Sequence, residues 1–515
     1  MALSLSTFSV VKPDFRGRRM SRISASISEK APSSTTPSPS TTTKFPVVEV
    51  PGGYGLPFLG AVADRLDYFW FQGKEDFFKS RIQRYQSTVF RTNMPPGPFI
   101  ADDPRVVVLL DGASFPVLFD VDKVEKRNLF TGTYMPSTEL TGGFRTVSYL
   151  DPSEESHQKI KRFIFSLLKS RRDKFIPEFR SVMAELFTGI ESTLATKGKA
   201  EFNSANQQAC FNYLSRAFLG RDPTAPGGIG TDGPSIIQKW VLLQLGPLLS
   251  VGLPKPLEEL LLHTFPLPPV LVKRDYERLL GYFRTAGAAA LDEAEALGLG
   301  REEACNNLLF TICFNTYGGM TILFPNIVKW LARAGPKVHR ELVQEIRQTL
   351  GSSPSAADLT PAALDRMPLV CSAVYEVLRI EPPVSAQYGK AKRDMVVESH
   401  TGAFRIRAGD MLCGYQPFAT RDARIFDDPE SFIADRFVGP DKDRLLRHVL
   451  WSNGRETDEP TESNKQCAGK DLIVMLARLL LVEIFLRYES FDIEVATAPL
   501  GSTITITSLR RNSPA

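Results

Sequence analysis

A single cysteine, Cys467, stands between a polar loop and a long apolar run, and no other stretch limits the possible folds of this chain as strongly. The polar loop begins at Trp451 (WSNGRETDEPTESNKQCAGKD), and the run DLIVMLARLLLVEIFLRY carries Leu, Ile and Val at helical spacing. Charged residues within the run, such as Arg478, predict a buried helix rather than a membrane span. Cys467 is therefore expected just before a helix N-terminus, where free N–H groups and the helix dipole stabilise a thiolate. Gly469 would let a flat partner approach the backbone closely.

Taken alone, a cysteine in this position is more often a small apolar core residue than a site residue, so a second motif has to decide. The segment Met367 to Ile380 (MPLVCSAVYEVLRI) provides it, because Glu376 and Arg379 lie three residues apart on one face of an otherwise apolar helix. A buried Glu/Arg pair is costly unless further hydrogen bonds hold it. Pro382 and Pro383 are expected to end this helix.

A third motif follows in the segment Asp428 to Phe437 (DPESFIADRF). An ExxR helix, a PxxF and DRF segment, and a Cys-x-Gly before a long helix, in this order and spacing, resemble the cytochrome P450 superfamily. The resemblance implies a mainly α-helical fold with small β-sheets, the cytochrome P450 fold. It also implies that Cys467 is the axial ligand of the iron of haem b, while Glu376, Arg379 and Arg436 stabilise the scaffold behind it.

The loop before the cysteine departs from the usual pattern. Typical members have a short F-x-x-G-x-R-x-C-x-G loop, whereas here an acidic insertion, Glu456 to Glu462, separates Gly454 from Cys467, and Lys465 stands in place of the usual arginine. This enlarged loop, with NKQCAG around the cysteine, resembles the plant branch of the superfamily that rearranges fatty acid hydroperoxides, and within it the allene oxide synthases. The resemblance extends from about Val50 to Leu509.

The composition predicts one large domain, residues 45–515. No linker interrupts the chain after residue 50, and 43% of the residues are hydrophobic, although length alone would allow about three domains. The net charge of +4 is small and has no strongly basic cluster in the folded part, so nucleic acid is not an expected partner. The six cysteines lack paired spacing, which argues against a disulfide framework or a zinc site and favours a reducing compartment.

Residues 1–44 have the composition of an organelle transit peptide. They are rich in Ser and Thr, carry several arginines, and contain only Asp14 and Glu29 as acids. We therefore expect a leader that is cleaved on import into a plastid; the alternative is a merely disordered tail. The apolar N-terminal span of about 20 residues that a membrane-anchored P450 needs is not found, which leaves peripheral contact with a plastid membrane open.

The segment Lys123 to Gly143 is expected to form a loop, and the resemblance implies that it lines the pocket over the haem. Phe130 matches an aromatic position associated with allene oxide synthases, where hydroperoxide lyases tend to have an aliphatic residue. A phenyl face near an unsaturated radical could stabilise the radical without a hydrogen bond. The alternative for a lone phenylalanine is simple packing.

Several cations are candidates to bind the haem propionates. His157 and Lys161 lie one turn apart on an amphipathic helix that follows Asp151, and they match the position where P450s place a propionate-binding pair. Lys126 and Lys465 are further candidates. Cationic side chains suit carboxylates, but each of these lysines taken alone is more often a solvated surface residue.

The stretch from Arg301 to Trp330 predicts a long apolar helix through the core. In P450s that activate dioxygen, an acidic residue beside a threonine in this helix relays protons, whereas no Asp or Glu occurs here between Glu303 and Glu341. An enzyme that receives a ready-made peroxide needs no such relay. Asn315 could hold a hydroperoxide through its amide; the alternative is an amide that is satisfied by a backbone carbonyl within the helix.

Other segments predict strands, helices and contacts with the substrate. Alternating apolar residues in STVFRTN, RVVVLLD, FRIRAGDML and ITITSL predict strands of small sheets, and Phe175 to Leu297 is expected to be mostly helical. Lys273 could meet the carboxylate of a fatty acid. Ser385 and Gln387, in a strand that resembles the border of the substrate channel, could touch the lipid.

Together these features predict dehydration of a fatty acid hydroperoxide, the 13-hydroperoxide of linolenic acid, to an allene oxide, with no reductase, NADPH or dioxygen. By resemblance, Cys467 and Asn315 carry the chemistry and Phe130 steers the radical. The alternatives are a hydroperoxide lyase of the same branch, a conventional P450 monooxygenase, and a haem carrier or sensor without turnover. The preference between 9- and 13-hydroperoxides and the oligomeric state stay open.

Overall fold

Helices form most of the folded part of the chain, as the 3.6-residue apolar periodicity predicts. The computed structural model describes residues 43–130, 132, 134–351 and 358–512, so the predicted leader, 1–44, lies outside the described residues except for its last two. The helices that surround the centre are α1 (Leu59–Leu66), α2 (Lys74–Tyr85), α3 (Glu155–Ser170), α6 (Gly233–Leu245), α7 (Lys255–Glu258), α8 (Lys273–Ala286), α9 (Ala288–Ala296), α12 (Pro361–Asp365), α13 (Pro368–Ile380), α14 (Gln416–Ala419) and α15 (Lys442–Leu446).

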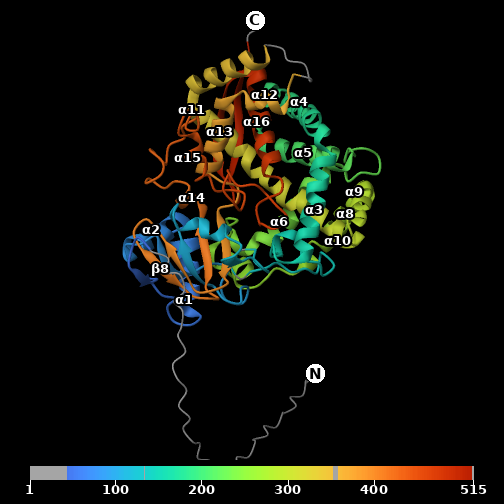
Figure 1. Cartoon of the computed structure of the whole chain (residues 1–515). Coiled ribbons are helices and arrows are strands. Elements are labelled where there is room, and N and C mark those ends of the chain that lie inside the picture. The colour runs from blue at the N-terminus through green and yellow to red at the C-terminus, as the bar shows by residue number, and fades with distance from the viewer. Residues whose placement is uncertain (1–42, 131, 133, 352–357, 513–515) are drawn as a thin grey trace, which may run out of the picture. The chain divides into compact units, whose positions relative to one another are not determined.

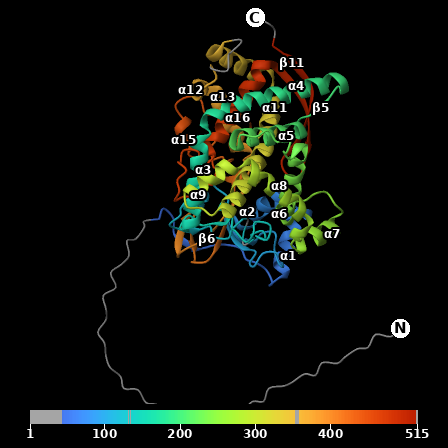
Figure 2. The ribbon, with the colours of Figure 1, turned by 90° about the vertical axis from the view of Figure 1, so that its right-hand side faces the viewer.

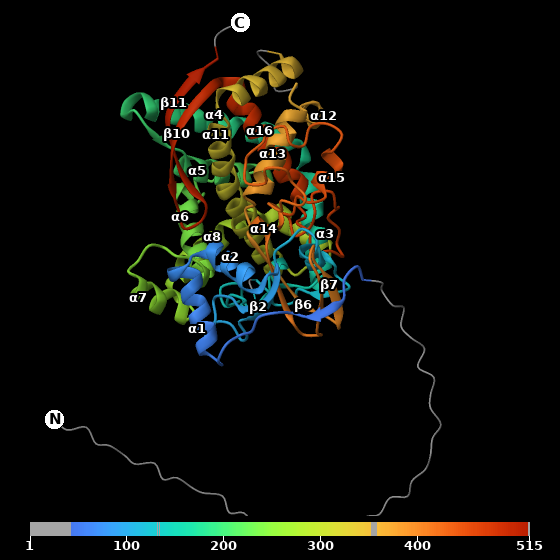
Figure 3. The same ribbon diagram turned by 90° about the vertical axis from the view of Figure 1, so that its left-hand side faces the viewer.

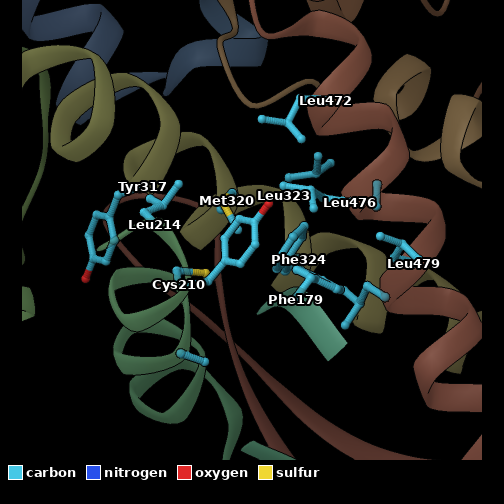
Figure 4. Close-up of a cluster of buried hydrophobic side chains, with 14 of the residues drawn as sticks. Phe179, Cys210, Leu214, Tyr317, Met320, Leu323, Phe324, Leu472, Leu476 and Leu479 are labelled. Atoms are coloured by element: carbon cyan, nitrogen blue, oxygen red, sulfur yellow. The ribbon is translucent and has the colours of Figure 1, made fainter. Parts of the chain in front are cut away.

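The core lies where long helices cross (Figures 1 and 4). They are α4 (Arg172–Lys197), α5 (Phe202–Leu214), α11 (Gly318–Leu350) and α16 (Lys470–Arg487). Figure 4 shows Phe179 of α4, Leu214 of α5, Phe324 of α11 and Leu476 of α16 pointing toward one another, and all four side chains are buried. Burial of such side chains contributes roughly 1.5–3 kcal/mol each, so this crossing is the main apolar support of the site.

The central helix is irregular where a regular α-helix is predicted. It begins as α10 (Arg301–Leu309), widens into the π-helix η9 (Phe310–Tyr317), and continues as α11 with a break at Gly335, whose φ is 80°. Among the described residues, the stretch Arg301–Leu350 is also long and apolar enough to cross a membrane, but 56% of its most apolar window is buried inside the fold. It is therefore a core helix, and the prediction from Arg301 to Trp330 was correct in place but not in regularity.

Short helical turns connect the longer elements. They are η1 (Asp67–Phe71), η2 (Phe115–Phe119), η3 (Val147–Tyr149), η4 (Ser215–Leu219), η5 (Gly230–Asp232), η6 (Gly246–Leu248), η7 (Glu259–Thr264) and η8 (Pro269–Leu271). The predicted helical character from Phe175 to Leu297 is confirmed by α4 to α9. Turns of this kind leave backbone groups unpaired within the helix, and η3 uses its carbonyls in the site described below.

The strands form three small sheets. The largest has the order β2-β3-β9-β6-β4, and the others are β1-β8-β7 and β10-β11-β5. FRIRAGDML was predicted as one strand, but a turn that contains Gly409 at φ 90° divides it into β8 and β9, which belong to different sheets. The bounds are β1 (Val47–Glu49), β2 (Val89–Asn93), β3 (Arg105–Leu109), β4 (Val124–Glu125), β5 (Ala200–Glu201), β6 (Ala386–Ala391), β7 (Met395–Glu398), β8 (Ala403–Ile406), β9 (Met411–Tyr415), β10 (Tyr488–Thr497) and β11 (Ser502–Arg511).

Candidate active site

Cys467 lies three residues before α16, as the sequence predicts. Its backbone N–H donates to the carbonyl of Ser452 at 2.8 Å, and its own carbonyl accepts from the N–H of Lys470 at 3.1 Å. Gly454 is held close to the buried amide of Gln466, because a Cβ at Gly454 would lie only 2.7 Å from the Gln466 Cδ. The loop is therefore closely packed on both sides of the cysteine.

The thiol of Cys467 is enclosed by protein and yet accessible. It is the one exposed cysteine of the six, and the other five are buried. Burial raises the pKa of this thiol, although the N–H of Gly469 and the charge of Lys161 oppose the rise. A sulfur that is deep in the protein and still accessible borders an interior space, and it needs a further positive charge to ionise.

The acidic insertion folds back onto this loop. Trp451 Nε1 donates to the carboxylate of Glu456 at 2.7 Å, and Lys470 Nζ donates to the carbonyl of Glu456 at 2.7 Å. Glu456 is buried, and burial raises its pKa despite these contacts. The insertion is thus a structural part of the cysteine loop, and only its outer end, Glu462, pairs with exposed Arg162.

Further hydrogen bonds compensate for the desolvation of the buried Glu376/Arg379 pair. Neither side chain is exposed; Arg379 donates to the two carboxylate oxygens of Glu376 at 2.7 and 2.8 Å, and Arg436 Nε donates to the same carboxylate at 2.9 Å. The remaining N–H groups of Arg379 donate to the carbonyls of Thr420, Pro429 and Ser431. These bonds tie α13 to the segment that leads toward the cysteine loop.

Of the four basic side chains predicted to bind propionates, Lys126, His157 and Lys161 are buried and Lys465 is partly buried. Lys126 donates to the side-chain oxygen of Asn453 at 2.5 Å, and Lys161 donates to the carbonyl of Asn464 at 2.6 Å. None of Lys126, Lys161 and Lys465 forms an ion pair with a carboxylate of the described residues. The fourth, His157, lies on α3 one turn before Lys161, and its buried Nδ1 has no hydrogen-bond partner among the described residues.

Burial lowers the pKa values of all four cations, and neighbouring lysines lower those of Lys465 and His157 further. Burial lowers the pKa of Lys126 to about 7, and burial together with the charges of Lys126 and Lys161 lowers that of Lys465 to about 7. Burial lowers the pKa of Lys161 to about 8, and burial, Lys465 and Lys161 lower that of His157 to about 3. The cluster thus has an excess of buried positive charge, which an anion would neutralise.

Asn315 lies in the π-helical turn η9 and, unlike most of its neighbours there, is exposed. Its Nδ2 donates to the hydroxyl of Ser148 at 3.4 Å. Ser148 belongs to η3, and Lys465 Nζ donates to the carbonyls of Val147, at 2.7 Å, and of Leu150. The short turn η3 therefore connects the basic cluster to Asn315.

Phe130 lies within an aromatic cluster beside Asn315. Its ring meets Phe314 edge-on at a centroid distance of 5.7 Å and Tyr149 at 5.8 Å. Phe314 stacks on Phe310 at 4.8 Å and meets Trp240 at 5.6 Å. Edge-to-face contacts of this kind hold ring orientations, so the structure brings Phe130 and Asn315 to one place through Phe314 and η3.

Lys273 and Ser385 are the other two residues predicted to contact the substrate. Lys273 is exposed at the first residue of α8 and makes no hydrogen bond or ion pair with a described residue, so it is not brought to Asn315 by any contact. Ser385 precedes β6, and Gln387 two residues later accepts from Lys126 Nζ at 3.5 Å. Alternation along the strand places Ser385 on the same face as Gln387.

Sequence reasoning missed Ser148 and Asn453. Ser148 had no signal of its own, because a serine in SYL next to a predicted helix is an ordinary loop residue. Asn453 did have a signal in the sequence, because it lies in the WSNG motif. In the structure its φ is 61°, which is typical of a turn residue. No group of three or more His, Cys, Asp or Glu side chains that could hold a metal ion occurs in the described ranges, so any iron here would depend on Cys467.

Comparison with known proteins agrees with this geometry. Residues 326–492 match the family model "Cytochrome P450". The chain is 59% identical to allene oxide synthase 1, chloroplastic, from Solanum lycopersicum, over 95% of this chain and 93% of that protein. It is 56% identical to the Linum usitatissimum allene oxide synthase, chloroplastic (99% and 93% covered), and 58% identical to the one from Arabidopsis thaliana (91% and 90%). The chain therefore belongs to the allene oxide synthase family of the cytochromes P450.

Proposed function

We propose that this protein is a hydro-lyase that removes water from the 13-hydroperoxide of linolenic acid, or of a similar polyunsaturated fatty acid, and releases an allene oxide for oxylipin and jasmonate synthesis. The observation that carries this proposal is the π-helical turn η9, where Asn315 is exposed. This turn belongs to a stretch between Glu303 and Glu341 that contains no acidic residue. Splitting dioxygen requires delivered protons, and a substrate that already contains the O–O bond does not. The names of the relatives agree with this activity and with a chloroplast location.

The cofactor of the P450 family is haem, and two features of the fold suit it. Cys467 offers one accessible sulfur in front of a helix N-terminus, and the nearby Lys126 and Lys161 are buried with no ion pair to a carboxylate of the described residues. Lys126, His157, Lys161 and Lys465 would bind the propionates, and the unpaired Nδ1 of His157 would gain an acceptor. When bound, the haem would supply a redox-active iron for homolytic cleavage of the O–O bond and for return of the electron.

Asn315 is proposed to position the hydroperoxide. Its Nδ2 already donates to Ser148 at 3.4 Å, which favours one amide orientation, and its side-chain oxygen Oδ1 accepts no hydrogen bond from the described residues. That oxygen can accept a hydrogen bond from the O–H of the hydroperoxide, and the second N–H of the amide can donate to a peroxide oxygen. Because Ser148 is in the same turn as the carbonyls that bind Lys465, substrate and cofactor would be positioned by one rigid segment.

Phe130 is proposed to direct the carbon radical toward an epoxide and then loss of a proton. Its ring is held by Phe314 and Tyr149, so a π-face is kept in place beside Asn315. A phenyl face stabilises electron-poor carbon, which favours transfer of the electron away from the substrate. An aliphatic side chain would give no such stabilisation, and cleavage of the carbon chain, the lyase outcome, would compete.

Replacement of Phe130 by leucine is expected to divert products from ketols toward short aldehydes, with at least a severalfold change in their ratio. The replacement keeps the site apolar and removes the π-face, so total turnover should change less than the product ratio. Mass spectrometry of the products measures this ratio, and Phe119→Leu, an aromatic replacement that lies outside this cluster, is the control. An unchanged ratio in Phe130→Leu would contradict the steering role.

The function itself is tested by giving the haem-loaded protein the 13-hydroperoxide of linolenic acid without NADPH and without oxygen. Ketols and cyclopentenone from a hydrolysed allene oxide are the expected products. Short aldehydes would make the protein a lyase, and turnover only with a reductase and oxygen would make it a monooxygenase. A thiolate-haem spectrum without any consumption of hydroperoxide would support a carrier or sensor instead.

The proposal also covers the reductase, the ends of the substrate path and the location of the protein. No reductase is required, because the substrate supplies the oxidising equivalent. Ser385 would touch the lipid from the face of β6 that carries Gln387, and Lys273 would reach a fatty acid carboxylate only at the outer end of the substrate path. Import would depend on the leader, residues 1–44, and contact with a plastid membrane would be peripheral.

A further inference from the structure

The hydroxyl of Tyr134 connects the loop that carries Phe130 to helix α6. The side chain of Tyr134 is buried, and its hydroxyl donates to the backbone carbonyl of Gln244 at 2.9 Å, across 110 positions of the sequence. Burial raises the pKa of Tyr134, so the hydroxyl keeps its proton and stays a donor. Tyr134 therefore fixes this loop to a helix that is distant in the sequence.

The carbonyl of Gln244 suits this bond because it lies in the last turn of α6. The last four carbonyls of an α-helix have no regular partner within the helix, and Pro247, three residues later, has no N–H group to offer. Gln244 is only 5% exposed. Removal of the Tyr134 hydroxyl would therefore take a hydrogen bond from a carbonyl that has little access to water, which is costly.

Within the loop, two contacts join Tyr134 to Phe130. The N–H of Phe130 donates to the carbonyl of Tyr134 at 3.1 Å. The two rings meet at a centroid distance of 6.5 Å and an interplanar angle of 66°. Phe130 is only half-buried, so the orientation of its ring depends on the few neighbours that it contacts, and Tyr134 is the one among them that bonds directly to α6.

Helix α6 also supports Phe130 from a second direction. Trp240, near the end of this helix, meets Phe314 at a ring-centroid distance of 5.6 Å, and Phe314 meets Phe130 at 5.7 Å. Figures 2 and 3 show α6 beside α8, from which Tyr276 meets Trp240 at 5.1 Å. Because α6 is itself packed against another helix, it can serve as a fixed support for the loop of Phe130.

We propose that Tyr134 is a positioning residue that influences which product is formed. Through its bond to α6 it holds the ring of Phe130 in one orientation, and this orientation favours the allene oxide over cleavage of the carbon chain. The inference rests on the proposed function, because it concerns the same radical and the same phenyl ring. A packing role would need only the ring of Tyr134, whereas a positioning role needs its hydroxyl.

The test compares Tyr134→Phe with the unmodified, haem-loaded chain on the 13-hydroperoxide of linolenic acid. Phenylalanine keeps the ring and removes the hydroxyl, so the ratio of ketols to short aldehydes should fall about two- to tenfold, the factor expected for one neutral hydrogen bond. Haem content and the thiolate spectrum should stay the same. The matched control is Tyr488→Phe, which removes a hydroxyl that donates to Glu191 at 2.7 Å and should leave the ratio unchanged.

A double variant decides whether Tyr134 acts through Phe130. If it does, adding Tyr134→Phe to Phe130→Leu leaves the product ratio of Phe130→Leu unchanged, since the ring that Tyr134 positions is already gone. A further shift of the same size in the double variant would show that the hydroxyl acts by another route, and the inference would be wrong. An unchanged ratio in Tyr134→Phe, or an equal shift in Tyr488→Phe, would overturn it as well.

A second measurement needs no turnover. 4-Fluorophenylalanine at position 130 reports the surroundings of this ring by fluorine NMR in the ferrous carbon monoxide form, which is diamagnetic. We expect one resonance when Tyr134 is present and a shifted or broadened resonance in Tyr134→Phe; identical resonances would contradict the inference. If the proposed function fails instead, the unmodified chain forms no ketols, while this difference between the resonances persists.

Discussion

Replacement of Cys467 by serine is expected to abolish turnover of the fatty acid hydroperoxide and the thiolate signature of the ferrous carbon monoxide spectrum. Loss of a hydrogen-bond partner of a metal ligand already costs about 10–100-fold, and loss of the ligand itself should cost more than 100-fold. The reason is local: the other cysteines are buried, and Cys467 alone is accessible in front of α16. Kinetic assays and haem spectra of the same preparation measure both effects.

Cys371→Ser is the matched control for this replacement. Cys371 is buried on α13, and its sulfur lies 3.8 Å from the carbonyl of Leu364, a contact that a hydroxyl can make as well. Turnover and spectrum should be retained in this variant. Retention of the thiolate spectrum in Cys467→Ser would instead require another cysteine as ligand, and a circular dichroism melt separates loss of the ligand from loss of the fold.

The sequence predicted the scaffold behind the cysteine better than its hydrogen bonds. Glu376 and Arg379 are visible because two opposite charges three residues apart in an apolar helix have to pair. The other partners of Arg379, such as the carbonyl of Pro429, are backbone groups about 40 to 50 positions away. Because every residue has a backbone carbonyl, the sequence does not show which carbonyl will accept a hydrogen bond from Arg379.

The widened turn η9 shows a different limit. Apolar periodicity predicts a helix from Arg301 onward, and a π-helix changes the backbone hydrogen-bond pattern without changing that periodicity much. The exposed position of Asn315 among buried neighbours depends on this local change. Its contact with Ser148 spans 167 positions, so it could only emerge from the packed structure.

The orientation of residues 255–264 shows a third limit. The run KPLEELLLHT predicts an amphipathic helix, but periodicity does not say which face is turned inward. Arg65 and Trp70, far away in sequence, decide it by binding Glu259. In contrast, family resemblance singled out Lys126 and Lys161, which are buried, whereas composition alone predicts lysines on the surface.

Replacement of Glu376 by glutamine is expected to lower the free energy of unfolding by about 3–5 kcal/mol, because one partner of a buried ion pair is removed and the other charges stay buried. Glutamine keeps the volume but not the charge, so Arg379 and Arg436 are left together without a counter-ion, and both are almost fully buried. Urea unfolding with saturating haem measures the change, since haem bound only to the folded state stabilises it.

Arg278→Gln is the control, because it removes one partner of an ion pair that is exposed to solvent. Arg278 lies 2.7 Å from Asp232, but the two side chains are 53% and 58% exposed, and surface pairs of this kind contribute little. Its urea midpoint should therefore stay near that of the unmodified chain. If Glu376→Gln behaved in the same way, the two arginines would be held by backbone carbonyls alone, and α13 would not depend on the carboxylate to fix the segment that leads to Cys467.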